Sequence, residues 1–186
     1  MGRLVYAMNV SLDGYAAAPG GSLDWTVVDE ELHSWWNDQV RGSAAALYGR
    51  RIYETMSAYW PTAADDPAAP PVMREVAAIW NAQPKIVFSR TLASVAWNSR
   101  LAAEEPADEL TRLKAEFDGD LEVSGPTLAA EFVRRGLVDE YGLVVHPVIL
   151  GDGLPFFPGL ERPAGLRLTE TRTFGSGVVL LRYAAR

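Results

Sequence analysis

The hydrophobic residues of the chain form two kinds of segment, short and long, which alternate. The short segments predict strands and the long ones predict helices. Short apolar runs without helical spacing are typical of buried strands. They occupy residues 3–10, 44–48, 85–89, 121–124, 141–150 and 178–184, and residues 166–174 are a further strand candidate beside the last of them. Longer segments place apolar residues three or four positions apart, which is typical of helices with one buried face. They occupy residues 29–41, 50–59, 72–81, 106–117 and 126–135.

The order of these elements predicts an α/β fold with three layers. Strands that alternate with helices usually form a mostly parallel, twisted sheet with helices on both faces. The last two strands flank Gly175, Ser176 and Gly177 without a helix between them, so we expect an antiparallel C-terminal hairpin. We interpret residues 60–71 as a surface loop within a single domain that spans 1–186. The ligand site of such a sheet is expected beyond the carboxyl ends of its strands.

Composition excludes several classes of function. The 186 residues carry a net charge of −7, which argues against a protein that binds nucleic acid or a membrane surface. There is no cysteine, so disulfide scaffolds, thiolate metal sites and cysteine nucleophiles are excluded. No apolar run reaches the roughly 18 residues of a membrane span, and we expect a soluble, cytoplasmic protein. His33 and His146 lie far apart in sequence, so no metal site is expected, and His146 is interpreted as a hydrogen-bonded core residue.

The turn that follows residue 48 has the chemistry of a phosphate site. Gly49 lets backbone N–H groups approach an anion, and Arg50 and Arg51 add positive charge at the start of a helix. The alternative is a tight turn with two solvated arginines. The turn alone does not decide between the two interpretations.

Two further turns repeat this chemistry at the ends of other strands. The Ser-Arg-Thr turn at 89–91 offers two hydroxyls and a guanidinium, which suit a terminal phosphate such as the 2′-phosphate of NADP. The alternative there is an ordinary exposed loop. The Ser-Gly-Pro-Thr turn at 124–127 offers a glycine and free N–H groups to a pyrophosphate, and its alternative is simple helix capping by Thr127.

Six short motifs occur in order from the first strand to the last. They are Ser-Leu-Asp-Gly-Tyr at 11–15, Gly-Arg-Arg with Tyr-Glu at 49–54, the strand and turn at 85–91, Ser-Gly-Pro-Thr-Leu at 124–128, Gly-Leu-Val-Asp-Glu at 136–140 and Gly-Asp-Gly-Leu-Pro-Phe-Phe at 151–157. On these motifs nearly the whole chain resembles the dihydrofolate reductase-like superfamily. Within it the chain is similar to the bacterial group that includes the C-terminal reductase domain of the bifunctional riboflavin-biosynthesis protein.

This resemblance implies an NADPH-dependent reductase, usually a homodimer, that transfers hydride to a small pterin- or pyrimidine-like heterocycle. The residues implied to bind the cofactor are Gly49, Arg50, Arg51, Ser89, Arg90, Thr91, Ser124, Gly125, Pro126, Thr127 and Leu128. Those implied to line the substrate side are Trp25, Tyr53, Tyr59 and Trp60. Asp13 and Glu31 are the candidate proton donors, directly or through a water that they hold.

Some positions depart from the pattern of the family. Leu32 stands where folate enzymes carry a helix carboxylate, Ser124 replaces a glutamate of the riboflavin reductases, and Pro126 replaces their second glycine. These departures favour an alternative function, a catalytically silent dimer that binds NADP or a flavin as a sensor. The Gly-Gly bond of the family is cis at this place. Because proline lowers the cost of a cis bond, we predict one between Gly125 and Pro126.

Overall fold

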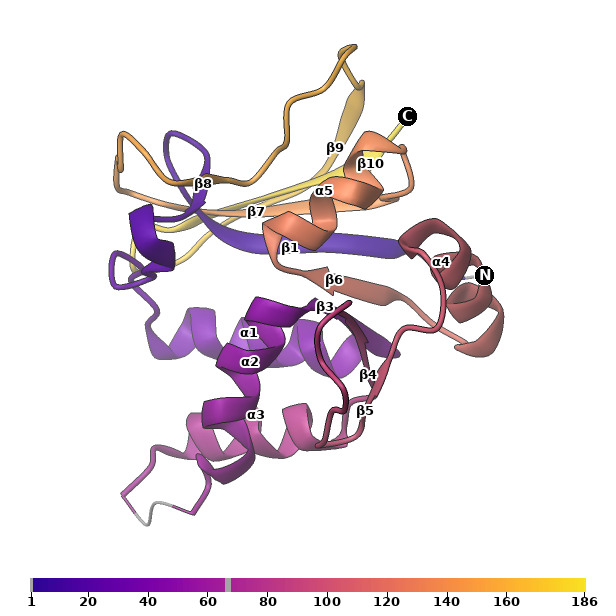
Figure 1. Ribbon diagram of the computed structural model, residues 1–186. Coiled ribbons are helices and arrows are strands. Elements are labelled where there is room, and N and C mark those ends of the chain that lie inside the picture. The colour runs from indigo at the N-terminus through magenta and orange to yellow at the C-terminus, as the bar shows by residue number, and fades with distance from the viewer. Residues whose placement is uncertain (1, 66–67) are drawn as a thin grey trace.

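The computed structural model describes residues 2–65 and 68–186, which form a large sheet between two layers of helices (Figure 1). The helices are α1 (Glu30–Gly42), α2 (Arg50–Tyr59), α3 (Pro71–Ala82), α4 (Pro106–Glu116) and α5 (Pro126–Arg134). The large sheet contains β1 (Leu4–Ser11), β3 (Ala45–Gly49), β4 (Lys85–Phe88), β5 (Ser99–Leu101), β6 (Leu121–Ser124), β7 (Glu140–His146), β9 (Leu166–Thr173) and β10 (Val179–Ala185). Two short strands, β2 (Tyr15–Ala17) and β8 (Leu154–Pro155), pair with each other. The element order confirms the predicted α/β class.

The strands of the large sheet run in the order β5-β4-β3-β6-β1-β7-β10-β9. From β5 to β7 every neighbouring pair is parallel, and β10 is antiparallel to both β7 and β9. The mostly parallel sheet and the antiparallel C-terminal hairpin are therefore confirmed. The first strand of the chain lies in the interior of the sheet, between β6 and β7.

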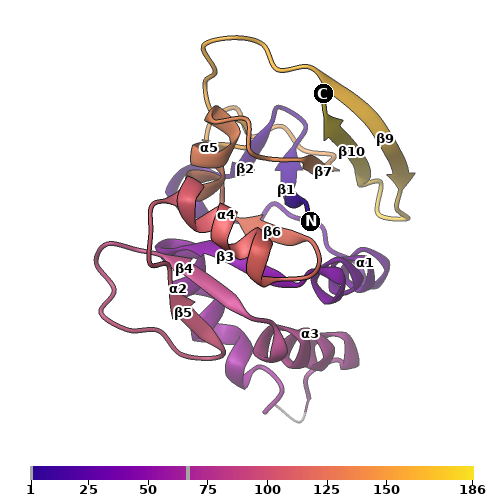
Figure 2. The same ribbon diagram turned by 90° about the vertical axis from the view of Figure 1, so that its right-hand side faces the viewer.

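Helices cover both faces of the sheet (Figure 2), and alternate side chains of the strands pack against one helical layer or the other. On one face, Leu47 and Val123 pack with Leu128 and Phe132 of α5 and with residues of α4. On the other face, Tyr48 and Val87 pack against α2 and α3, and Val144 and Leu180 pack against Leu32 and Trp35 of α1. This arrangement confirms the three-layer architecture. No helix in the described part of the chain is long and apolar enough to cross a membrane.

The structure differs from the sequence-based prediction at short elements. β2, β5 and β8 were not predicted, since each has only two or three residues and no periodicity of its own. β7 ends at His146 rather than at 150, because Pro147 has no N–H and the Val148 N–H donates to the carbonyl of His146 at 2.8 Å. The predicted loop 60–71 contains a 3₁₀ turn (Trp60–Thr62), and its residues 66–67 lie outside the described residues.

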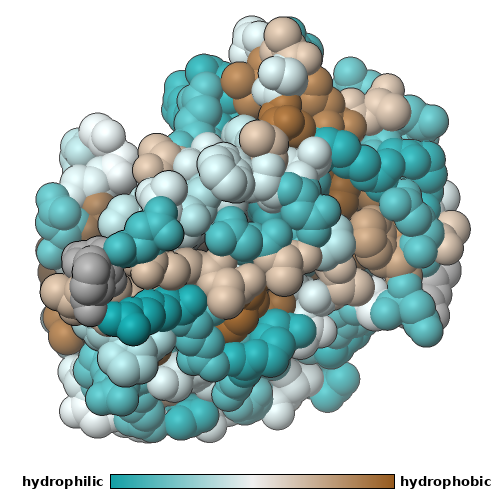
Figure 3. All heavy atoms as spheres, turned by 90° about the horizontal axis from the view of Figure 1, so that it is seen from below, coloured by the Kyte–Doolittle hydropathy of each residue, from teal (hydrophilic) through white to brown (hydrophobic). Residues whose placement is uncertain are grey.

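The hairpin of β9 and β10 presents an uncovered apolar face on the side of α5. By the strand register, Leu181 and Tyr183 of β10 share this face with Leu166 and Leu168 of β9, and Leu168 is 51% exposed. The helices lie farther along the sheet (Figure 2). Seen from below, the surface mixes hydrophilic residues with hydrophobic patches (Figure 3).

Candidate functional site

The three turns singled out in the sequence lie side by side at one edge of the sheet. They follow β4, β3 and β6, which are neighbours in that order. Gly49 lies opposite Phe88, and Tyr48 lies opposite Ser124. The segments that continue these parallel strands therefore leave the sheet next to one another. The structure thus brings together the whole predicted cofactor-binding set.

Two helices begin at this edge with uncapped N-termini. α2 begins after Gly49 and α5 after Gly125, and neither N-cap residue offers a side chain to the N–H groups of the first turn. A Cβ on Gly125 would lie 3.3 Å from Cγ2 of Ile52, so the start of α5 packs closely against α2. Free N–H groups and the helix dipole make such N-termini favourable for phosphate.

The peptide bond between Gly125 and Pro126 is trans, so the predicted cis bond is wrong. Gly125 turns the chain into α5 with φ 94° and ψ 123°, a conformation that glycine adopts without a Cβ clash. Pro126 then occupies the first turn of the helix, where a missing N–H leaves no hydrogen bond unmade. The change of direction is made at Gly125 rather than at the proline.

The arginines of the two other turns differ in their partners. Arg50 forms a 3.3 Å ion pair with Glu54 one helical turn away. The exposed guanidinium groups of Arg51 and Arg90 form no hydrogen bond or ion pair with any residue that the structure describes. The Oγ of Ser89 accepts hydrogen bonds from backbone N–H groups that follow it, at 3.2 and 3.0 Å, and so shapes the turn. Arg51 and Arg90 are therefore the charges available to an anion.

Asp13 joins the loop after β1 to the loop after β7. Its carboxylate accepts hydrogen bonds from the N–H groups of Leu150 at 3.1 Å and Gly151 at 2.7 Å. The Ser11 hydroxyl contributes most to lowering the pKa of Asp13 to about 2, and these two N–H groups contribute less. An ionised carboxylate is an acceptor only. The role of Asp13 as proton donor stays a prediction, and its contacts are those of a loop anchor.

Glu31 holds the turn of the C-terminal hairpin against α1. It accepts hydrogen bonds from the Arg172 guanidinium at 2.9 Å and from the Gly175 N–H at 3.1 Å, and both lower its pKa. The hairpin lies three strands from β6, a separation of roughly 14 Å at the usual strand spacing. The role of Glu31 as proton donor likewise stays a prediction, and the structure does not bring Glu31 to the three turns.

A network around His146, missed in the sequence, supports the loop that carries Trp25. The His146 ring is fully buried, with Nε2 3.0 Å from Oδ1 of Asn9 and Nδ1 accepting the N–H of Val27 at 3.1 Å. Because Nδ1 is an acceptor, the imidazole is neutral with its proton on Nε2, and burial lowers its pKa. Trp36 donates to the same Asn9 oxygen at 3.2 Å, and Trp25 meets the His146 ring edge to face. The core interpretation of His146 is confirmed.

The other predicted substrate residues lie in α2 and in the 3₁₀ turn that follows it. Tyr53 is buried, and its hydroxyl accepts the Ala96 N–H at 2.8 Å, which fixes the segment after β4. Tyr59 and Trp60 lie at the far end of α2, roughly 14 Å along the helix from Gly49. Their role toward a substrate stays a prediction. Instead, Trp25 has exposed apolar neighbours in the same loop, which are Leu23, Val27 and Val28.

The edge formed by the three turns fits a phosphorylated dinucleotide. Donors and positive charge lie over three adjacent strands. They come from two uncapped helix N-termini, from the exposed Thr91, and from Arg51 and Arg90, which are unpaired within the described part of the chain. A Cβ on Gly49 would contact Leu128 and a Cβ on Gly125 would contact Ile52, so these two glycines let the starts of α2 and α5 lie close together. An acidic protein with this local concentration of donors is suited to a small phosphorylated ligand rather than to a polyanion.

Comparisons of sequence agree with this geometry. Residues 3–180 match the RibD C-terminal domain family. The uncharacterized protein YyaP from Bacillus subtilis (strain 168) is 31% identical over 182 residues, which cover 97% of this chain and 94% of YyaP. The uncharacterized protein YwjB of the same organism is 27% identical over 182 residues, 96% of this chain and 95% of YwjB.

Solved structures give the same fold. A protein from Shewanella sp. PV-4 that is named for riboflavin biosynthesis superposes with a TM-score of 0.78 at 20% identity, over 99% of each chain. The bifunctional deaminase and 5-amino-6-(5-phosphoribosylamino)uracil reductase of Thermotoga maritima superposes with a TM-score of 0.68 at 14% identity, over the whole of this chain and 57% of the larger one. This chain therefore belongs to the RibD C-terminal domain family, with the dihydrofolate reductase-like fold.

Proposed function

We propose that the protein is an NADPH-dependent reductase that transfers hydride to a small pyrimidine- or pterin-like heterocycle. The observation that carries this proposal is the set of three donor-rich turns at adjacent strand ends, where Arg51 and Arg90 have no partner among the residues that the structure describes. Family membership and the pyrimidine reductase-like protein of Corynebacterium diphtheriae, which has the same fold at a TM-score of 0.61, support a reductase. The substrate class follows from these relatives.

In this proposal each turn binds a different part of the cofactor. Arg90 and Thr91 hold the 2′-phosphate, since a guanidinium and a hydroxyl both donate to phosphate oxygens. Arg51 and the N-termini of α2 and α5 hold the pyrophosphate. NADPH, when bound, supplies the hydride. The Trp25 loop, held by His146, covers the acceptor and limits the access of water.

The adenosine end of the site is tested by cofactor preference. In a thermal-shift titration we expect NADPH to stabilise the protein more than NADH does. Arg90→Ala should remove this difference, because the 2′-phosphate loses its charged partner. Arg134→Ala changes an exposed arginine at the other end of α5 and should keep the preference. Equal stabilisation of the unmodified protein by NADPH and NADH would refute the role of Arg90.

A second candidate is a catalytically silent dimer that binds NADP or a flavin as a sensor. It is favoured by the contacts of Asp13 and Glu31, whose carboxylates are both engaged as acceptors in loop contacts. The two functions separate in one assay, in which NADPH absorbance at 340 nm is followed with pterins, pyrimidines and flavins. Oxidation with any acceptor supports the reductase, whereas tight NADPH binding without oxidation supports the sensor. A yellow purified protein would indicate a bound flavin.

We also propose that the protein is a homodimer. On one face of the hairpin, Leu168 is half exposed, and Leu181 and Tyr183 are only partly buried. The chain exposes 9786 Å², whereas a globular monomer of 20.3 kDa exposes about 8,800 Å². A second copy of this chain would cover the apolar face.

A further inference from the structure

A cavity lies at the other end of the parallel strands from the three turns. It has a volume of about 140 Å³, lies between the C-terminal half of α1 and the amino ends of β1 and β6, and is partly open to solvent. Residues of the sheet and residues at the end of α1 line it, among them Arg3, Val5, Gln39, Ser43, Glu122 and Arg182. It is therefore separate from the candidate cofactor edge, and nothing in the proposed reductase function uses it.

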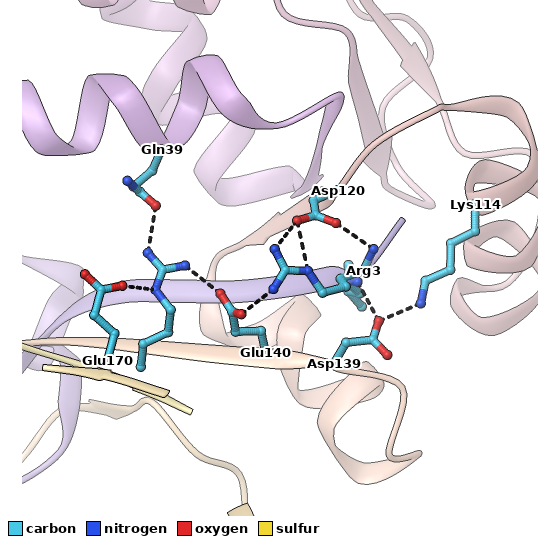
Figure 4. A network of polar contacts seen from close by, with 9 residues as sticks. Arg3, Gln39, Lys114, Asp120, Asp139, Glu140 and Glu170 are labelled. Carbon is cyan, nitrogen blue, oxygen red and sulfur yellow. Dashed lines mark hydrogen bonds and ion pairs between the residues drawn. The ribbon is translucent and has the colours of Figure 1, made fainter. Parts of the chain in front are cut away.

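The two arginines that line this cavity already have anionic partners. Figure 4 shows Arg3 between Asp120 and Glu140. Arg3 donates to Glu140 at 2.6 Å and also pairs with Asp120. Arg182 donates to Glu140 at 2.5 Å, pairs with Glu170 at 3.1 Å, and donates to Oε1 of Gln39 at 2.7 Å. Each guanidinium is thus oriented by groups other than Glu122.

Glu122 is the carboxyl group that this network leaves without a partner. It is 9% exposed and forms no hydrogen bond or ion pair with any residue that the structure describes. Burial raises its pKa to about 7, and the charge of Arg182 opposes that shift. The titratable groups that face it from the surrounding elements are Arg3, Asp38, Tyr48, Asp120, Glu140 and Arg182. A buried carboxylate needs a cation or donors to remain ionised.

We propose that this cavity binds a small organic cation with N–H donors, of the guanidinium or primary ammonium type, on the carboxylate of Glu122. The two carboxylate oxygens match the paired N–H groups of a planar guanidinium. The other two carboxylates that line the cavity already have cationic partners, Asp38 with Arg41 and Asp120 with Arg3, which leaves Glu122 as the anionic partner for a ligand. The volume admits a group of only a few non-hydrogen atoms, so the ligand is a free small molecule or the end of one.

Titration calorimetry with methylguanidinium at constant ionic strength tests this site in the full chain. At pH 8 about nine-tenths of Glu122 is ionised, and at pH 5.5 about 3%, so the affinity should fall roughly thirtyfold between these values. Glu122→Gln should weaken binding at pH 8 by at least about tenfold and remove the pH dependence. Tetramethylammonium, which has no N–H donor, should bind no better to the unmodified protein than to this variant.

Glu131→Gln is the matched control, because Glu131 is an exposed glutamate on α5, far from the cavity. It should bind methylguanidinium as the unmodified protein does. Glu122→Gln also removes an unpaired buried charge, so it should melt at or above the temperature of the unmodified protein at pH 8. The absence of binding at 50 mM methylguanidinium, or equal binding by Glu122→Gln, would overturn the proposal.

Discussion

His146 couples the stability of the protein to pH through two hydrogen bonds. Its neutral ring accepts the Val27 N–H and donates to Asn9, and its folded-state pKa lies below that of the unfolded chain. Between these two pKa values the unfolded state binds more protons, so stability falls as the pH is lowered through about 6.5. From pH 7 to 5.5 this histidine should cost at most about 1.3 kcal/mol.

Urea unfolding at the two pH values measures this contribution. His146→Asn should be less stable at pH 7, because the Val27 N–H loses its acceptor, but it should lose less stability on acidification. His33, whose pKa is also lowered by burial, contributes with the same sign, so His33→Asn serves as the comparison. If His146→Asn keeps the full pH dependence of the unmodified protein, the neutral buried ring is not its source.

The pair of β2 and β8 depends on the absence of a side chain at Gly153. This residue has φ 150°, and a Cβ on it would lie 2.1 Å from the carbonyl oxygen of Ala17. Gly153→Ala should therefore destabilise the protein by about 2 kcal/mol or more, because the two loops must separate. Gly151→Ala, at φ 77° with no atom within 4 Å, should cost only the backbone strain of about 1 kcal/mol. Equal losses in denaturant unfolding would show that Ala17 yields without cost.

Elements with a strong internal pattern could be predicted from the sequence, and those made by pairing could not. α5 has its apolar residues on one face, so its sequence shows helical spacing. β8 has only two residues and is a strand only because it pairs with β2. The turns of the candidate site were predictable because each directly follows a buried strand. The contact of Val27 with His146 joins residues 119 apart, and no local pattern indicates it.

At the scale of the whole molecule, the uncovered face of the hairpin should set the oligomeric state. Leu168→Glu places a charge on this face and should convert a dimer into a monomer in analytical ultracentrifugation, because a buried unpaired carboxylate is costly. Ala78→Glu makes the same change at an exposed position on α3 and should leave the mass unchanged. A monomeric unmodified protein would contradict the proposed dimer directly.

The interior position of β1 has a consequence for the order in which the ribosome delivers the chain. β1 leaves the ribosome well before its two neighbours, β6 and β7, which begin at Leu121 and Glu140. At usual rates of translation, residue 121 is added roughly 6 to 23 seconds after residue 4. During that time the apolar first strand has no partner in the sheet, while β3 and β4 can already pair with each other. In the nascent chain, β1 is therefore a strand that needs protection from aggregation, for example by a chaperone, until β6 and β7 have been synthesised.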